Sequence, residues 1–554
     1  MAESTTLDQT PDARVVSDNA GPGGATPNAE PAYAPWKPKF NPWAVALTVT
    51  LATFMEVLDT SIANVALPHI AGGLSASQDE STWVLTSYLV SNAVVLPISA
   101  WLSVLVGRKR FYMTCVALFT ISSFLCGLAP TLGMLVLFRV LQGLGGGGLA
   151  TSEQAILADT FSPEKRGVAF AVYGMAVVLA PAIGPTLGGW ITDNYSWRWI
   201  FYINVPVGLI SLYLTNRIVE DPPYMKSEQQ KTLRNPIDYM GLGLIAVGIG
   251  CLQYVLDKGQ EEDWFSSAKI TMLLTVAIVA LLFFVINEWR HDYPIMDLRL
   301  MKNRNFAASA FMMFVMGMVL FASTVLIPQF LQTLMGYTAR QSGEALSAGG
   351  IVLVLMMPIV GRLITRVDPR LMIAFGFTST ALALFHMTSI NLQIDFKTAT
   401  MYRVYQTIGL PFLFIPISTL AYLGVPSHKS NQVAGMNNFA RNLGGSIGIS
   451  MLATGLQRLS QQHQVYLSAH TTTSNPAFVQ RINGIAQTFV AQGVPANEAT
   501  ARAYSLISRT VAGQSALLAY VDIISISAVA LFCLVPLVFL MQRPPKGSAP
   551  AAAH

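Results

Sequence analysis

Blocks of about twenty consecutive apolar residues recur along most of this 554-residue chain. A helix of that length crosses the ~30 Å hydrocarbon core of a bilayer, whereas a membrane strand needs about half as many residues in strict alternation. Hydrophobic residues make up 53% of the chain and charged residues 11%, against roughly 25% charged residues in soluble domains. The sequence therefore predicts an all-α integral membrane protein.

We expect fourteen transmembrane helices, with boundaries placed to within a few residues. Their predicted centres lie near residues 55, 93, 119, 146, 179, 208, 247, 278, 318, 354, 380, 412, 444 and 527. The first span, from about Trp43 to Leu67, is a retained helix, because no apolar region of the signal-peptide kind opens the chain. Residues 1–41 are rich in Pro, Gly, Ala and Asp and predict a disordered tail, with a second tail at residues 542–554.

Lysine and arginine are concentrated in alternate loops. One set of loops carries clusters such as residues 108–110 and Lys165-Arg166, whereas residues 68–82, in the other set, contain neither Lys nor Arg. By the positive-inside rule both termini are cytoplasmic, and the even number of spans agrees.

The chain also repeats itself at a fixed offset. Arg139 and Arg403 are 264 residues apart (403 − 139), and so are Gln142 and Gln406. Two parallel six-helix halves, with helices 7 and 8 inserted between them, are an architecture of alternating-access transporters. The expected parts are helices 1–6 in residues 42–218, the inserted helices and flanking loops in 219–304, and helices 9–14 in 305–541.

Four segments resemble motifs of the major facilitator superfamily. They read LDTSIANVALPHI (58–70), LFRVLQGLGGG (137–147), GMAVVLAPAIGPTLGG (174–189) and WRWIFYINVPVG (197–208). The resemblance is strongest to its fourteen-helix drug:proton antiporters of the EmrB/QacA type, and among these to the inner-membrane subunits of tripartite multidrug pumps. It implies the major facilitator fold and proton-driven export of hydrophobic compounds from a bacterial cell. It also implies two partners, a periplasmic adaptor protein and a TolC-like outer-membrane channel.

Proton-coupled export needs a carboxylate that changes its protonation state inside the membrane. Asp59 matches the family's acidic motif within the first span, and Glu56 lies one turn earlier on the same face. Arg139 is the predicted charge partner of Asp59, and Glu153 is a further carboxylate at membrane depth. Each has a structural alternative: Asp59 fixes the end of helix 1, Arg139 ties helices 1 and 4 together, and Glu153 makes a helix contact.

Other polar residues at membrane depth could line a substrate cavity. They are Gln142, Arg403, Gln406, Asn437, Asn438, Arg441 and Asp522. Asp522 on the last span could neutralise Arg441. In the second half these charges fit either a tie between helices or a contact with substrate.

Four glycines and a proline in the fifth span match the family's antiporter motif: Gly174, Gly184, Pro185, Gly188 and Gly189. The spacing of Gly184 and Gly188 predicts close helix packing. Gly184-Pro185 further predicts a lost hydrogen bond, and hence a break or kink in that helix.

The loop after helix 2 departs from the family pattern. It reads AWLSVLVGRKR, with Val104 where the family has an acidic residue. A cytoplasmic gate therefore has to use other groups. We predict that Gly107, Arg108 and Lys109 form it together with Asp159, whose carboxylate can reach Arg108 or Lys109.

Residues 458–510 form an outer loop of unusual length. Apolar residues at mixed three- and four-residue spacing predict helices with one apolar face, and the last span is expected to begin outside the membrane. The loop fits either docking to an adaptor or a lid on the protein's own outer face.

The sequence contains no HExxH, Walker A or GxSxG motif, and all four cysteines lie in apolar spans. We therefore expect no enzymatic activity, no cofactor or metal, and no nucleic-acid partner. The prediction is a proton-coupled multidrug exporter of the bacterial inner membrane. Two alternatives stay open: an exporter dedicated to one endogenous compound, such as a fatty acid, siderophore or toxin, and a non-transporting membrane sensor.

Overall fold

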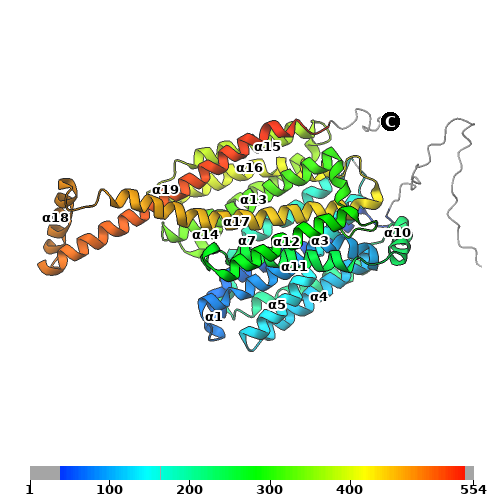
Figure 1. The fold of residues 1–554 in the computed structure, drawn as a ribbon, viewed down its shortest axis with the longest axis horizontal. Helices are drawn as coiled ribbons and strands as arrows, with labels where there is room; N and C mark the ends of the chain where they lie inside the picture. Colours follow the sequence, from blue (N-terminus) through cyan, green and yellow to red (C-terminus); the bar gives the residue numbers. More distant parts are fainter. Residues whose placement is uncertain (1–37, 163, 543–554) are drawn as a thin grey trace, which may run out of the picture. The chain divides into compact units, whose positions relative to one another are not determined.

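A computed structural model describes residues 38–162 and 164–542, and these residues form a bundle of long helices (Figure 1). Of the predicted tails at residues 1–41 and 542–554, residues 1–37 and 543–554 lie outside the described residues. The first helices are α1 (Pro42–Gly73), α2 (Gln78–Ser81), α3 (Trp83–Val106), α4 (Arg108–Leu128), α5 (Leu132–Gly146), α6 (Leu149–Thr160), α7 (Arg166–Asn194), α8 (Trp199–Tyr202) and α9 (Asn204–Ile218). Between the halves lie α10 (Pro223–Arg234), α11 (Tyr239–Lys258) and α12 (Ala268–Arg290). The remaining helices are α13 (Arg304–Thr333), α14 (Ala339–Leu363), α15 (Pro369–Met387), α16 (Phe396–Ala421), α17 (Ser430–Ser468), α18 (Pro476–Ala491) and α19 (Ala496–Val538).

Short polar residues mark where helices begin. The side chain of Asn41 accepts a hydrogen bond from the backbone amide of Trp43 (2.9 Å), and Pro42 occupies the first turn, where its missing N–H costs little. Asp395 caps α16 in the same way, through the amide of Thr398 (3.1 Å). These caps satisfy backbone groups that a helix leaves unpaired at its start.

Thirteen helical segments of the described chain are long and apolar enough to cross a membrane, and they contain every predicted centre except that at residue 444. That centre lies in α17, which is more polar because it carries Asn437, Asn438 and Arg441. These three side chains are buried, and α17 packs against α3, α13 and α19. Its polar residues therefore face other helices rather than lipid, which is why apolar content alone does not identify it as a span.

The inserted helices α11 and α12 pack against each other, and α11 also packs against α3. Large apolar side chains of α12 are exposed: Met272, Val276, Ile278, Val279, Leu282, Phe283, Val285 and Ile286. An apolar surface of this kind suits contact with lipid. The inserted pair therefore has one side toward the bundle and one side suited to the bilayer.

The predicted break in the fifth span is wrong, because α7 runs without interruption across Pro181 and Pro185. Pro185 has no N–H to bond the carbonyl of Pro181, and the Ser61 hydroxyl of α1 donates to that carbonyl instead (3.4 Å). Close packing is confirmed. A Cβ atom added to Gly184 would lie 2.3 Å from Ser61 Oγ, and one added to Gly188 would lie 3.0 Å from Ile62.

The long loop of residues 458–510 is mostly helical, as predicted. It contains the end of α17, all of α18 and the start of α19, a helix of 43 residues. Phe478 and Ile482 of α18 pack with Ala503 of α19. In Figure 1, α18 and the beginning of α19 extend beyond the ends of the neighbouring helices. The last span therefore begins as a helix well before its apolar segment.

Candidate transport site

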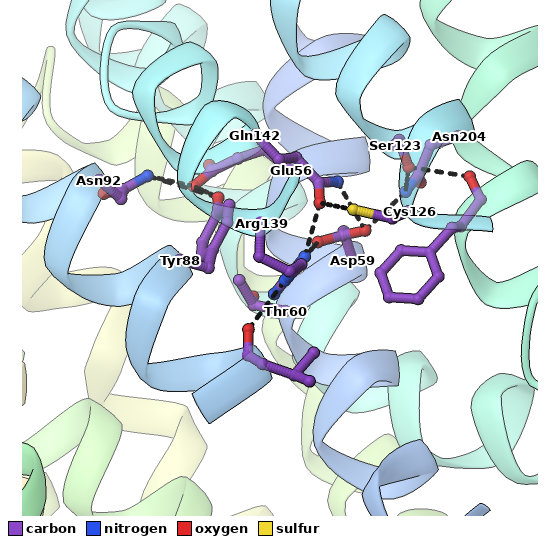
Figure 2. Close-up of polar contacts among 12 residues, drawn as sticks. Glu56, Asp59, Thr60, Tyr88, Asn92, Ser123, Cys126, Arg139, Gln142 and Asn204 are labelled. Carbon is purple, nitrogen blue, oxygen red and sulfur yellow. Dashed lines mark hydrogen bonds and ion pairs between the residues drawn. The ribbon is translucent and has the colours of Figure 1, made fainter. Parts of the chain in front are cut away.

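A buried ion pair joins α1 and α5. Arg139 Nη1 lies 2.6 Å from Asp59 Oδ2, and both side chains are at most 1% exposed. Gln142 bridges the pair, since its Nε2 donates to Asp59 Oδ1 (3.0 Å) and its Oε1 accepts from Arg139 Nη1 (2.8 Å). Figure 2 shows the three side chains converging. The ion pair expected from the sequence is present, and Gln142 belongs to it rather than to a cavity wall.

A residue that the sequence prediction missed completes this network. Asn204 Nδ2, at the start of α9, donates to Asp59 Oδ1 (2.7 Å) and to Ser123 Oγ (3.0 Å). Arg139 Nε donates to the carbonyl of Val84 (3.0 Å), and its guanidinium lies 4.4 Å from the centre of the Tyr88 ring. Asp59 thus accepts from three donors. An isolated amide within the apolar segment WIFYIN was the available signal for Asn204.

Glu56 lies one turn from Asp59 but has different surroundings. Its Oε1 accepts hydrogen bonds from Tyr88 Oη (3.0 Å) and Asn92 Nδ2 (3.3 Å), both on α3 (Figure 2). Glu56 lines a cavity of about 200 Å³, whereas Asp59 does not. Of the two carboxylates on α1, Glu56 is the one that can meet a bound molecule.

This central cavity is bounded by both halves of the chain and by an inserted helix. Its walls include Thr53 and Glu56 of α1, Tyr88 and Asn92 of α3, Gln253 and Asp257 of α11, Phe321 of α13, and Phe439 and Arg441 of α17. Most of the lining is apolar, and it also includes the carboxylates of Glu56 and Asp257 and the guanidinium of Arg441. The contribution of α11 to the cavity was not predicted. Asp257, which hydrogen-bonds Thr86 on α3, was the polar residue that could have indicated it.

A second polar network crosses between the halves beside this cavity. Asn438 Nδ2 on α17 donates to Gln154 Oε1 on α6 (2.9 Å), and Tyr173 Oη on α7 donates to Asn438 Oδ1 (3.0 Å). Arg441 Nη1 in turn donates to Tyr173 Oη (2.9 Å). Asn438 and Arg441 therefore tie the halves together, while Arg441 also faces the cavity. Asn437 is buried beside them without a hydrogen-bond partner for its side-chain amide in the described chain.

The predicted neutralisation of Arg441 by Asp522 is wrong. Asp522 on α19 instead pairs with His463 Nε2 on α17 (2.7 Å). His463 lies 22 residues beyond Arg441 (463 − 441) on the same helix, which corresponds to about 33 Å at 1.5 Å per residue. Asp522 is therefore remote from the cavity.

Glu153 is fully buried on α6 but does not line the central cavity. Its Oε1 accepts a hydrogen bond from Thr50 Oγ1 of α1 (2.6 Å), and its Oε2 has no partner in the described chain. The position between α1 and α6 matches the predicted helix contact, and the role as a proton relay stays a prediction.

At the end of the bundle where α4 begins, Asp159 connects several helices. It forms an ion pair with Arg108 of α4 and accepts hydrogen bonds from Tyr224 of α10 and, at 3.1 Å, from Ser430 of α17. Burial, with the nearby charge of Asp159, raises the pKa of the Tyr224 hydroxyl, so it stays a donor. The predicted contact of Asp159 with Arg108 is confirmed. Lys109 instead donates through Nζ to the carbonyl of Asn216 (2.7 Å).

Gly107, the remaining predicted member of that gate, links α3 to α4. Its φ of +94° is a backbone conformation that side chains with a Cβ rarely adopt. The turn it makes places Arg108 at the first position of α4, directed at Asp159.

Comparisons with known proteins agree with this architecture. The sequence profile of the Major Facilitator Superfamily matches residues 49–449. The chain is 36% identical over 512 residues to the fatty acid resistance protein FarB of Neisseria gonorrhoeae, covering 92% of this chain and 98% of that one. It is 37% identical over 449 residues to the multidrug export protein EmrB of Escherichia coli K12, covering 80% and 86%. The human organic anion transporter MFSD10 shares the fold, with a TM-score of 0.56 at 12% identity over 91% of this chain and all of that one.

The fold and the cavity between two helical halves define a multi-pass membrane transporter. The chain belongs to the major facilitator superfamily.

Proposed function

We propose that this chain is a proton-coupled exporter of several hydrophobic or amphipathic compounds. The observation that carries the proposal is the placement of Glu56 on the wall of the central cavity, one turn from the buried Asp59–Arg139 pair. A proton and a substrate can then compete for Glu56 on the cavity wall. The charge of Glu56 in turn acts electrostatically on the neighbouring ion pair. The similarity to EmrB, a multidrug export protein by name, supports the substrate range.

In this proposal Asp59 is the coupling group, and Arg139 holds or releases its proton. Glu56 exchanges protons with the cavity, and Glu153 is a further relay carboxylate. The Arg108–Asp159–Tyr224 cluster closes the cytoplasmic end. The basic loops support placing this end and both termini in the cytoplasm, with the protein in the inner membrane. The helical segment around α18 is available on the opposite side for a periplasmic adaptor, which would pass substrate to an outer-membrane channel.

A second candidate is an exporter dedicated to fatty acids, and the similarity to FarB over 92% of the chain supports it. A growth-inhibition panel separates the candidates. Expression in a pump-deficient bacterial strain should protect against several unrelated hydrophobic compounds if the first proposal is right. Protection confined to fatty acids would favour the second. Loss of a pH-driven dye gradient in proteoliposomes on adding a protonophore would support proton coupling, and an unchanged gradient would contradict it.

A further inference from the structure

Arg403 on α16 is a buried guanidinium without a carboxylate partner. Its side chain is 3% exposed, and Nη1 donates to two neutral oxygens, Ser323 Oγ (3.0 Å) and Gln406 Oε1 (2.8 Å). Its Nε has no hydrogen-bond partner among the described residues, and none of the ion pairs in that part of the chain includes Arg403. A buried charge without an opposite charge is costly, so an anion from outside the chain can stabilise it.

The first half of the chain shows which group Arg403 lacks. Arg139 bonds Gln142 Oε1 at 2.8 Å, and Arg403 bonds Gln406 Oε1 at the same distance. The offset of 264 residues that relates these pairs carries Asp59 onto Ser323 (59 + 264), and Ser323 is the residue that Arg403 contacts. The two halves thus share one arrangement, except that a hydroxyl replaces the carboxylate in the second.

A small cavity adjoins this guanidinium. Arg403 lines a cavity of about 20 Å³ whose other walls are largely apolar, including Pro181 of α7, Leu320 of α13 and Leu346 of α14. Val177 and Phe321 line both this cavity and the central cavity. A molecule whose apolar body occupies the central cavity therefore needs only to pass these two side chains for its polar end to reach Arg403.

We propose that Arg403 binds the carboxylate of amphipathic anionic substrates, with their apolar part in the central cavity. The inference rests on the proposed export function and narrows its substrates to a class that includes alkyl carboxylates. The guanidinium of Arg403 supplies the positive charge, and Gln406 orients the guanidinium. Because Ser323 is neutral, the substrate carboxylate can supply the opposite charge. A free inorganic anion such as chloride offers the same charge without the apolar body.

The test uses the full-length protein in lipid nanodiscs, with empty nanodiscs subtracted, and dodecanoate and dodecyltrimethylammonium as probes. Ser323→Asp should supply the missing carboxylate and weaken dodecanoate binding by about tenfold or more, as expected when a buried charge pair is disrupted. Asn has nearly the same shape as Asp but carries no charge. Ser323→Asn should therefore keep dodecanoate binding near the wild-type value. Binding of dodecyltrimethylammonium should be unchanged in both variants, which also shows that they are folded.

Equal dodecanoate binding by the Asp and Asn variants, or an equal loss in both, would overturn the proposal. So would binding of acetate or chloride as tightly as dodecanoate, because the site would then hold a small free anion. Should Ser323→Asp fail to fold, Arg403→Gln must weaken dodecanoate selectively for the proposal to stand. These are binding measurements on purified protein. Failure of export in cells with selective dodecanoate binding intact would therefore reject the proposed function and not this site.

Discussion

Glu56 and Asp59 are three residues apart on α1, yet only Glu56 faces the central cavity. Asp59 accepts from Arg139, Gln142 and Asn204, whereas Glu56, within the described part of the chain, accepts only from neutral groups of α3. Asp59 is therefore engaged by one ion pair and two amide hydrogen bonds. Glu56 can be protonated without breaking an ion pair, and the two groups are close enough to sense each other's charge.

Glu56→Gln should abolish transport driven by a pH gradient while leaving the fold intact. The amide oxygen can still accept from Tyr88 and Asn92, so little stability is lost. Dye efflux from proteoliposomes after a pH jump is the measurement, with substrate exchange at equal pH as the control for intact binding. pH-driven efflux at the wild-type rate would show that Glu56 is not in the proton path.

Asp59→Asn should also abolish coupling, but with a loss of stability. It leaves the Arg139 guanidinium buried and unpaired, which costs about 3–5 kcal/mol. The double variant Asp59→Asn/Arg139→Gln removes both charges and should recover most of the melting temperature without recovering coupling. If the double variant pumps protons normally, the ion pair is only a tie between α1 and α5.

The sequence predicted the fold because hydrophobic length and charged-loop alternation are local properties. It also predicted the Asp59–Arg139 pair, because two opposite charges at membrane depth stabilise each other when they pair. It did not predict which way each side chain points: a helix face read from spacing places Glu56 and Asp59 together, and only packing against α3 and α5 separates them. The pairing of Asp522 with His463 was missed for a related reason. The alignment of α19 along α17 depends on the long helical extension that precedes the apolar segment of α19, and hydropathy does not locate that extension.

Gly184→Leu should reduce transport and thermal stability together. The added side chain would collide with Ser61, whose hydroxyl bonds the carbonyl that Pro185 leaves free, and such overpacking costs about 1–3 kcal/mol. Gly189→Leu is the matched control, because nothing within 4 Å opposes a Cβ there. The comparison is made by initial efflux rate and melting temperature. Equal effects of the two substitutions would exclude the α1 contact as the cause.

Tyr224→Phe should loosen the end of the bundle closed by Asp159. It removes a hydroxyl that hydrogen-bonds both Arg108 and Asp159, and the expected loss of stability is about 1–2 kcal/mol. Hydrogen–deuterium exchange of α10 should rise, because Tyr224 anchors that helix to the bundle. Tyr239→Phe, at a position 74% exposed, serves as the control. Unchanged hydrogen–deuterium exchange of α10 in Tyr224→Phe would show that the Arg108–Asp159–Tyr224 cluster does not depend on this hydroxyl.

The helical segment formed by the end of α17, α18 and the start of α19 gives the final prediction. α18 packs against α19 through Phe478 and Ile482, and apolar side chains such as Val490 and Tyr504 stay exposed. Exposed apolar groups on a projecting helix pair suit a protein partner, so the adaptor interpretation is favoured over a lid.

His463 and Asp522 hold α17 and α19 together near the base of the segment, so residues 469–512 can be replaced by a link of about ten Gly and Ser residues without straining the bundle. Transport in proteoliposomes should survive this replacement, whereas drug resistance of cells and co-purification of an adaptor should be lost. Loss of transport in proteoliposomes would favour the lid, and retention of both transport and resistance would exclude either role.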